Sequence, residues 1–191
     1  MAKSNLHAPG AFADEGDELN VIIETPKGSR NKFDYDEKLG LFKLGGVLPA
    51  GASFPFDFGF VPSTLGGDGD PLDVLVLMDE PAFAGCLVRT RLVGVVEAEQ
   101  TERDGETTRN DRLIAVSAES RLYARARSLN TLPPTLVEEI EHFFVSYNQL
   151  KGKEFEPRGR FGPAHALRIV EEGARQYKQT KRKRAAKKPR R

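Results

Sequence analysis

Residues 54–60 read FPFDFGF and residues 74–78 read VLVLM, and these two stretches indicate the fold class. In the first, phenylalanine occupies every even position, so one face of an extended segment would be aromatic. The second is a short apolar run, which is typical of a strand buried on both faces. A loop rich in glycine and aspartate separates them. The pattern predicts two strands, and we expect the phenylalanine rings to pack in the core.

Strand-like segments also lie on both sides of this pair. They are marked by β-branched or alternating residues, at residues 19–25, 32–36, 41–44, 87–99 and 112–117. The Asp104–Gly105 dipeptide predicts a hairpin turn between the last two. The spacing then becomes helical over residues 136–150, and a second helix is predicted from about residue 163 to 177. Short strands followed by helices predict an α+β fold, mainly β, in which the strands close into a small barrel.

Charge is unevenly distributed along the 191 residues. Nine of the 29 Lys and Arg residues lie in residues 178–191, which contain no acidic residue. Residues 1–177 contain the other 20 basic residues and all 28 acidic ones, so their net charge is −8, whereas the net charge of residues 178–191 is +9. The net negative charge of residues 1–177 repels the phosphate backbone of nucleic acid, which argues against a folded domain that binds nucleic acid over its surface. We predict a flexible arm at residues 1–18, one domain at residues 19–177 and a disordered basic tail at residues 178–191.

The sequence predicts a cytoplasmic protein. Its longest apolar run, residues 74–78, is too short to span a bilayer, and the first residues lack the apolar stretch of a secretory signal. Cys86 is the single cysteine, so no internal disulfide can form, which fits a reducing compartment.

Three carboxylates lie close together in the sequence DGDPLD, at Asp68, Asp70 and Asp73. Like charges at this spacing are costly when partly desolvated, unless a cation offsets them. Ligand sets made only of oxygen suit hard cations such as Mg²⁺ or Mn²⁺, and the spacing does not match the calcium-binding helix-loop-helix pattern. A solvated acidic turn is the alternative. The proline and the direct entry into a buried strand favour a metal site.

Further charged residues occur on the first strands. Glu24 ends an apolar strand, and Lys32 and Asp34 stand two residues apart, hence on one face of theirs. A lysine beside carboxylates near a metal cluster is what phosphate binding requires, because the cation neutralises oxygens while the carboxylates hold metal. Each residue could also be an ordinary partner in a surface ion pair.

The order of these segments resembles that of the soluble family I inorganic pyrophosphatases. The resemblance covers about residues 19–155 and includes VIIETP, NKFDYD, FPFDFGFVPSTLGGDGDPLDVLVLM and LPPTLVEEIEHFFVSYNQLKGK. Its most specific motif is DGDPxD, between an aromatic-Gly-aromatic strand and an LVG strand. The resemblance implies a five-stranded barrel of the oligonucleotide-binding type with two flanking C-terminal helices. It also implies Mg²⁺-dependent hydrolysis of pyrophosphate to two phosphates and, in bacteria, commonly a hexamer.

The resemblance implies roles for individual residues. Asp70 matches the carboxylate that deprotonates the attacking water, and Lys32, Arg112 and Tyr147 match phosphate-binding groups. Lys43 is the cation nearest to a family arginine position that falls on Gly45 or Gly46 here. The implied metal ligands are all carboxylates: Asp68, Asp70, Asp73, Glu24, Asp34, Glu99 and Asp111.

Several positions depart from the family pattern. Phe58 stands in place of a tyrosine, Asn148 in place of a lysine, and Asp34 where the family usually has glutamate. The family's D-x-x-x-x-D-x-K hairpin is the most altered part, with Arg112 at the lysine and Asn110 at the second aspartate. The first aspartate falls near Glu99 or Gln100. A one-residue bulge would bring Glu99 and Asp111 into the metal shell.

These departures leave two alternatives to pyrophosphate hydrolysis. The same fold could act on another phosphoanhydride, such as a nucleotide or polyphosphate. It could instead be a non-catalytic module that binds phosphate or nucleic acid through its basic tail.

Overall fold

The computed structural model describes residues 9–13 and 18–186. The first half holds strands β1 (Leu19–Thr25), β2 (Asn31–Asp36), β3 (Leu41–Val47), β4 (Asp57–Phe60) and β5 (Asp73–Leu77). The second half holds β6 (Leu87–Thr101), β7 (Thr107–Arg109), β8 (Arg112–Ser117), a short 3-10 helix (Leu129–Thr131), α1 (Pro134–Leu150), β9 (Glu154–Phe161) and α2 (Pro163–Ala186). Within these residues, no helix is long and apolar enough to cross a membrane.

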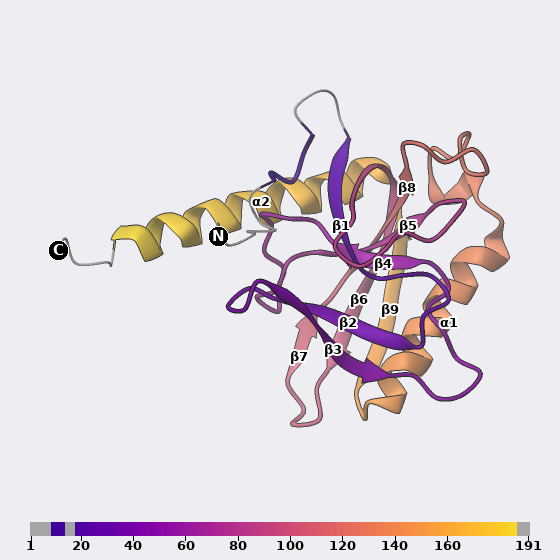
Figure 1. Cartoon of the computed structure of the whole chain (residues 1–191), viewed down its shortest axis with the longest axis horizontal. Coiled ribbons are helices and arrows are strands. Elements are labelled where there is room, and N and C mark those ends of the chain that lie inside the picture. The colour runs from indigo at the N-terminus through magenta and orange to yellow at the C-terminus, as the bar shows by residue number, and fades with distance from the viewer. Residues whose placement is uncertain (1–8, 14–17, 187–191) are drawn as a thin grey trace.

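Five strands close into a ring, which confirms the predicted barrel. β1 pairs with both β4 and β6, β4 with β5, β5 in parallel with β8, and β8 with β6. β7 and β9 extend the sheet from β6, while β2 and β3 form a separate hairpin (Figure 1). Gly59 permits the close approach of β4 to β1, because a Cβ there would lie 2.0 Å from the Ile22 carbonyl oxygen.

The barrel strands are buried on both faces, and each face packs toward a different helix. On β5, Leu75 and Leu77 join the core cluster that contains Phe144 of α1, whereas Val74 and Val76 join the cluster that contains Val170 of α2. This division explains why β5 reads as an unbroken apolar run. The four phenylalanines of residues 54–60 are all buried, as predicted, although only Asp57–Phe60 forms a strand.

Three segments differ from the sequence-based expectation. Glu154–Phe161 forms β9, although its proline and its many charges argue against a strand. It pairs with β6 at the edge of the sheet, and Arg158 is an extra, unpaired residue on β9 opposite Glu97 and Ala98. α2 continues to Ala186, so the basic segment is helical to that residue. In the predicted arm, Ala11 is buried and its carbonyl accepts a hydrogen bond from the Asn20 amide. Residues 1–8, 14–17 and 187–191 lie outside the described residues.

Candidate active site

A cavity of about 1020 Å³ opens between the barrel, the β2–β3 hairpin, α1 and α2. Carboxylates line one part of it, at Glu24, Asp34, Asp68, Asp70 and Asp73. Cations line it as well, at Lys32, Lys43, Arg112, Lys151, Lys153 and Lys181. The phenylalanine strip contributes Phe54, Phe58 and Phe60 to the wall. The cavity therefore combines groups suited to metal ions with groups suited to anions.

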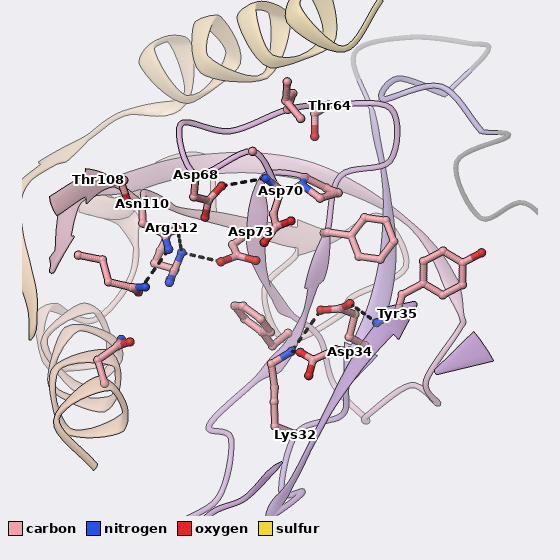
Figure 2. Close-up of a pocket in the computed structure, with 18 of the residues that line it drawn as sticks. Lys32, Asp34, Tyr35, Thr64, Asp68, Asp70, Asp73, Thr108, Asn110 and Arg112 are labelled. Atoms are coloured by element: carbon pink, nitrogen blue, oxygen red, sulfur yellow. Dashed lines mark hydrogen bonds and ion pairs between the residues drawn. The ribbon is translucent and has the colours of Figure 1, made fainter. Parts of the chain in front are cut away.

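The acidic loop is shaped by its own backbone. The Asp68 carboxylate accepts a hydrogen bond from the Asp70 amide at 3.1 Å, and the Gly66 amide donates to the Asp70 carbonyl at 2.7 Å. Gly69 sits in the left-handed region at φ 90°, where a side chain would be strained. This tight turn presents Asp68 and Asp70 at the cavity surface, ahead of the buried strand β5 (Figure 2).

Asp70 lies among like charges. Burial raises the pKa of its carboxyl group, and the carboxylates of Asp68 and Asp34 raise it further. In the described part of the chain, neither Asp68 nor Asp70 forms an ion pair. Negative charge is thus gathered here without a protein cation to offset it, which favours binding of an external cation.

Lys32 is held by two carboxylates. Its ammonium lies 2.9 Å from Asp34 Oδ1 and 3.2 Å from Glu24 Oε2, and 4.9 Å from the centroid of the Phe58 ring. Burial lowers the pKa of Lys32, but Glu24 and Asp34 raise it by more, so the side chain stays cationic. The other Glu24 oxygen accepts a hydrogen bond from the Tyr35 amide at 2.8 Å. Both Glu24 oxygens are therefore engaged by the protein, and Glu24 acts here as the partner of Lys32.

Arg112 is the buried cation at the other end of the carboxylate cluster. Its Nη1 donates to Asp73 Oδ2 at 2.6 Å and to the Asn110 side-chain oxygen (Figure 2). The guanidinium lies over two neighbouring rings, Phe144 and Phe155, 4.9 and 5.2 Å from their centroids. Burial raises the pKa of Asp73, while the charges of Arg112 and Lys32 oppose the rise.

α1 contributes the residues that the resemblance places near substrate. Tyr147 lines the cavity, and its hydroxyl is buried with no hydrogen-bond partner in the described structure. Lys151 lies one turn later, with its ammonium 4.3 Å from the centroid of the Tyr147 ring. Asn148 is buried and donates to the Phe144 carbonyl at 2.9 Å.

Lys43, from β3, is exposed and lies 3.3 Å from Asp36.

Glu99 and Asp111 do not line the main cavity, in contrast to the expectation from the sequence. Glu99 forms an ion pair with Arg158 of β9 at 2.6 Å, because the alternation of β6 directs Gln100 toward the cavity instead. Asp111 accepts from Arg109 at 2.7 Å and from the Ala98 amide at 3.2 Å. It lines an adjoining cavity of about 180 Å³, behind the acidic loop.

The structure adds two residues that the sequence did not single out: Glu102 and Lys153 line the cavity and pair at 2.7 Å. Of the two candidates for the first hairpin position, Gln100 lines the cavity and Glu99 does not. The Asn110 amide donates to Gln100 Oε1 at 3.3 Å. The hairpin pairing selects Gln100 over Glu99, because β6 keeps one register from Val96 opposite Arg112 to Gln100 opposite Thr108.

The donor set fits a hard divalent ion. In the described residues, no group of three acidic, histidine or cysteine side chains is arranged to hold a metal by itself. Mg²⁺ is commonly bound through one or two carboxylates, with water and substrate oxygens completing its shell. Asp68 and Asp70 present such oxygens at the cavity surface.

Known proteins resemble this chain over most of its length. A family model described as inorganic pyrophosphatase matches residues 21–178. The inorganic pyrophosphatase of Synechocystis sp. is 39% identical over 160 residues, covering 84% of this chain and 92% of that protein. That of Geobacillus stearothermophilus is 36% identical over 164 residues, covering 85% and 96%. The crystal structure of inorganic pyrophosphatase from Thermus thermophilus has a TM-score of 0.83 and 36% identity, over 92% of this chain and 99% of that one. The chain belongs to the inorganic pyrophosphatase family.

Proposed function

We propose that this protein hydrolyses inorganic pyrophosphate to two phosphates and that it requires Mg²⁺, with Mn²⁺ as a substitute. One observation carries the proposal: the unpaired carboxylates of Asp68 and Asp70 share a cavity with the buried cations Lys32 and Arg112. Such a cavity can bind metal and phosphate side by side. The family membership supports the choice of substrate.

Asp68 and Asp70 would hold the metal, with Asp34 and Asp73 nearby. When bound, Mg²⁺ supplies positive charge that neutralises phosphate oxygens and makes water a better nucleophile. Asp70 accepts the proton of the attacking water. Its position among carboxylates increases its affinity for that proton.

The chain's own cations hold the substrate. Arg112 is fixed by Asp73, and its Nε has no hydrogen-bond partner in the described structure, so it can donate to a phosphate oxygen with little loss of side-chain freedom. The Lys32 ammonium already contacts Glu24, Asp34 and the Phe33 carbonyl, so Lys32 acts on phosphate through its charge. The unpartnered Tyr147 hydroxyl provides a further donor. Lys43 and Lys151 add positive charge at the edge of the cavity.

The test is phosphate release from pyrophosphate with and without Mg²⁺, beside the Asp70→Asn variant. We expect release that requires Mg²⁺ and falls by at least about 100-fold in the variant, since a general base and metal ligand is lost. Release that is equal in the two proteins, or independent of metal, would contradict the proposal.

We also propose a cytoplasmic homo-oligomer, with a hexamer as the implied form. Large hydrophobic side chains are exposed on this chain, including Phe83 and Leu122, and a second copy could cover them. Light scattering after size exclusion gives the mass directly, and a monomeric mass would reject the assembly.

A further inference from the structure

The outer turns of α2 form part of the cavity wall. Tyr177, Thr180 and Lys181 line the same cavity as Asp70 and Lys32. Figure 1 shows α2 running beyond the barrel on the side to which the tip of the β2–β3 hairpin also points. The sequence placed the domain boundary at residue 177, so it separated these turns from the site. The structure makes them one surface.

This wall is strongly basic. After Glu172, α2 contains no further acidic residue, and its outer turns carry Lys178, Lys181, Arg182 and Lys183. Among the described residues, none of these four cations forms an ion pair, and all four are exposed. Unpaired cations beside an acidic cavity lower the electrostatic cost of bringing an anion to it.

The cavity is also large for its proposed substrate. Its volume of about 1020 Å³ matches the upper end of pockets that hold drug-sized ligands, and pyrophosphate is much smaller. The residues that would bind pyrophosphate gather around Asp70, Lys32 and Arg112. Lys181 and Thr180 line the same cavity and are not part of this group, and Lys181 is exposed.

We propose that Lys181 and Thr180 form an outer anion subsite that binds the distal phosphate of linear inorganic tripolyphosphate, which the protein hydrolyses as a second substrate. The inference rests on the proposed function, because the reaction uses the same inner site. The Lys181 ammonium lies 5.7 Å from the centroid of the Tyr177 ring. The wall therefore presents charge over its aromatic ring, which favours a bare phosphate chain over a nucleoside.

The reaction is the one proposed for pyrophosphate. Water adds to the terminal phosphorus in the inner site, and the bond from that phosphorus to its bridging oxygen breaks. The bridging oxygen leaves with the electron pair as part of pyrophosphate. One water proton stays on the released phosphate, and the other passes through Asp70 to solvent. The products are one phosphate and one pyrophosphate.

The test compares Lys181→Ala with the matched control Lys178→Ala, which changes a cation on the same helix that does not line the cavity. Initial rates with Mg²⁺ give KM for tripolyphosphate and for pyrophosphate. We expect the ratio of these two constants to rise about fivefold in Lys181→Ala and to stay unchanged in Lys178→Ala. An equal rise in both variants would show long-range attraction only and would overturn the subsite, as would an unchanged ratio in Lys181→Ala.

A binding measurement separates this inference from the proposed function. In the Asp70→Asn background with Mg²⁺, calorimetry should show that Lys181→Ala weakens the binding of tripolyphosphate more than the binding of pyrophosphate. ATP is tested in parallel. If Lys181→Ala weakens the binding of ATP as much as the binding of tripolyphosphate, the inferred preference for a bare phosphate chain is wrong. If pyrophosphate binds and is hydrolysed but tripolyphosphate is neither bound nor hydrolysed, the subsite fails while the proposed function stands. If pyrophosphate itself is not hydrolysed by the unmodified protein, the proposed function fails.

Discussion

Asp73 and Arg112 stand side by side at the first positions of two parallel strands, and their side chains form an ion pair of 2.6 Å. The parallel register of β5 and β8, with Val74 opposite Leu113, places them there. The pair joins the end of the acidic loop to the strand that follows the hairpin. The carboxylates that suit metal and the guanidinium that suits phosphate are thus fixed relative to each other by the sheet.

Replacing this arginine by lysine tests the geometry of the guanidinium. Arg112→Lys keeps the charge but loses the planar group that lies over two neighbouring aromatic rings and reaches both Asp73 and Asn110. We expect kcat/KM for pyrophosphate to fall at least about tenfold. Arg109→Lys is the matched control, because Arg109 pairs with Glu97 and Asp111 outside the main cavity. A larger loss in the control would reject a direct role for Arg112.

The acidic loop and the adjoining cavity make different predictions for metal binding. Asp68→Asn should weaken Mn²⁺ binding about tenfold or more, because a carboxylate oxygen without a protein cation is lost. Asp111→Asn should change Mn²⁺ binding little, since the Asp111 carboxylate already pairs with Arg109 and accepts a hydrogen bond from the Ala98 amide. Electron paramagnetic resonance of free Mn²⁺ during titration measures both. A larger loss of Mn²⁺ affinity in Asp111→Asn than in Asp68→Asn would show that the metal binds in the adjoining cavity behind the acidic loop.

The hydroxyl of Tyr147 should matter for substrate and not for folding. It is buried without a hydrogen-bond partner in the described structure, so its removal in Tyr147→Phe should shift Tm by no more than about 1–2 °C. If the hydroxyl donates to phosphate, kcat/KM for pyrophosphate should fall about tenfold. Tyr123→Phe, next to the core but outside the cavity, serves as the control. Unchanged kinetics in Tyr147→Phe would remove this residue from the site.

Asp57 predicts a pH dependence of stability. It is fully buried; one oxygen accepts from the Ala82 amide at 3.0 Å, and the other has no partner in the described structure. Burial raises the pKa of Asp57, so the folded state holds the proton more tightly than the unfolded state. The resulting stabilisation is complete below the unfolded pKa and is lost as pH rises through the folded pKa.

Asp57→Asn should therefore remove part of that pH dependence. We expect the variant to be more stable than the unmodified protein by about 1–2 kcal/mol at pH 8, because no buried charge is formed. The difference should shrink as the pH falls toward the unfolded pKa of the carboxyl group. Urea unfolding at several pH values measures it, and parallel pH profiles for the two proteins would contradict the role of Asp57.

The local elements follow from the sequence alone. Alternation and apolar runs fix strands such as residues 19–25 and 112–117, because side chains in a strand point to opposite faces with a period of two. The sequence also predicted the acidic loop as a metal site, because three carboxylates close together before a buried strand repel one another unless a cation is bound. The order of short strands before helices predicted the closed barrel, and the resemblance then supplied several of the cavity-lining residues, including Lys32, Arg112 and Tyr147.

Contacts between distant segments fix which neighbouring side chains face the cavity. On β6, a shift of one residue in register exchanges Glu99 for Gln100, and no local pattern fixes that register across a long hairpin. β9 forms because β6 offers it an edge, and Lys181 belongs to the cavity because α2 packs beside the barrel. These features depend on contacts between segments far apart in the chain, whereas sequence periodicity reports only on the segment that contains it.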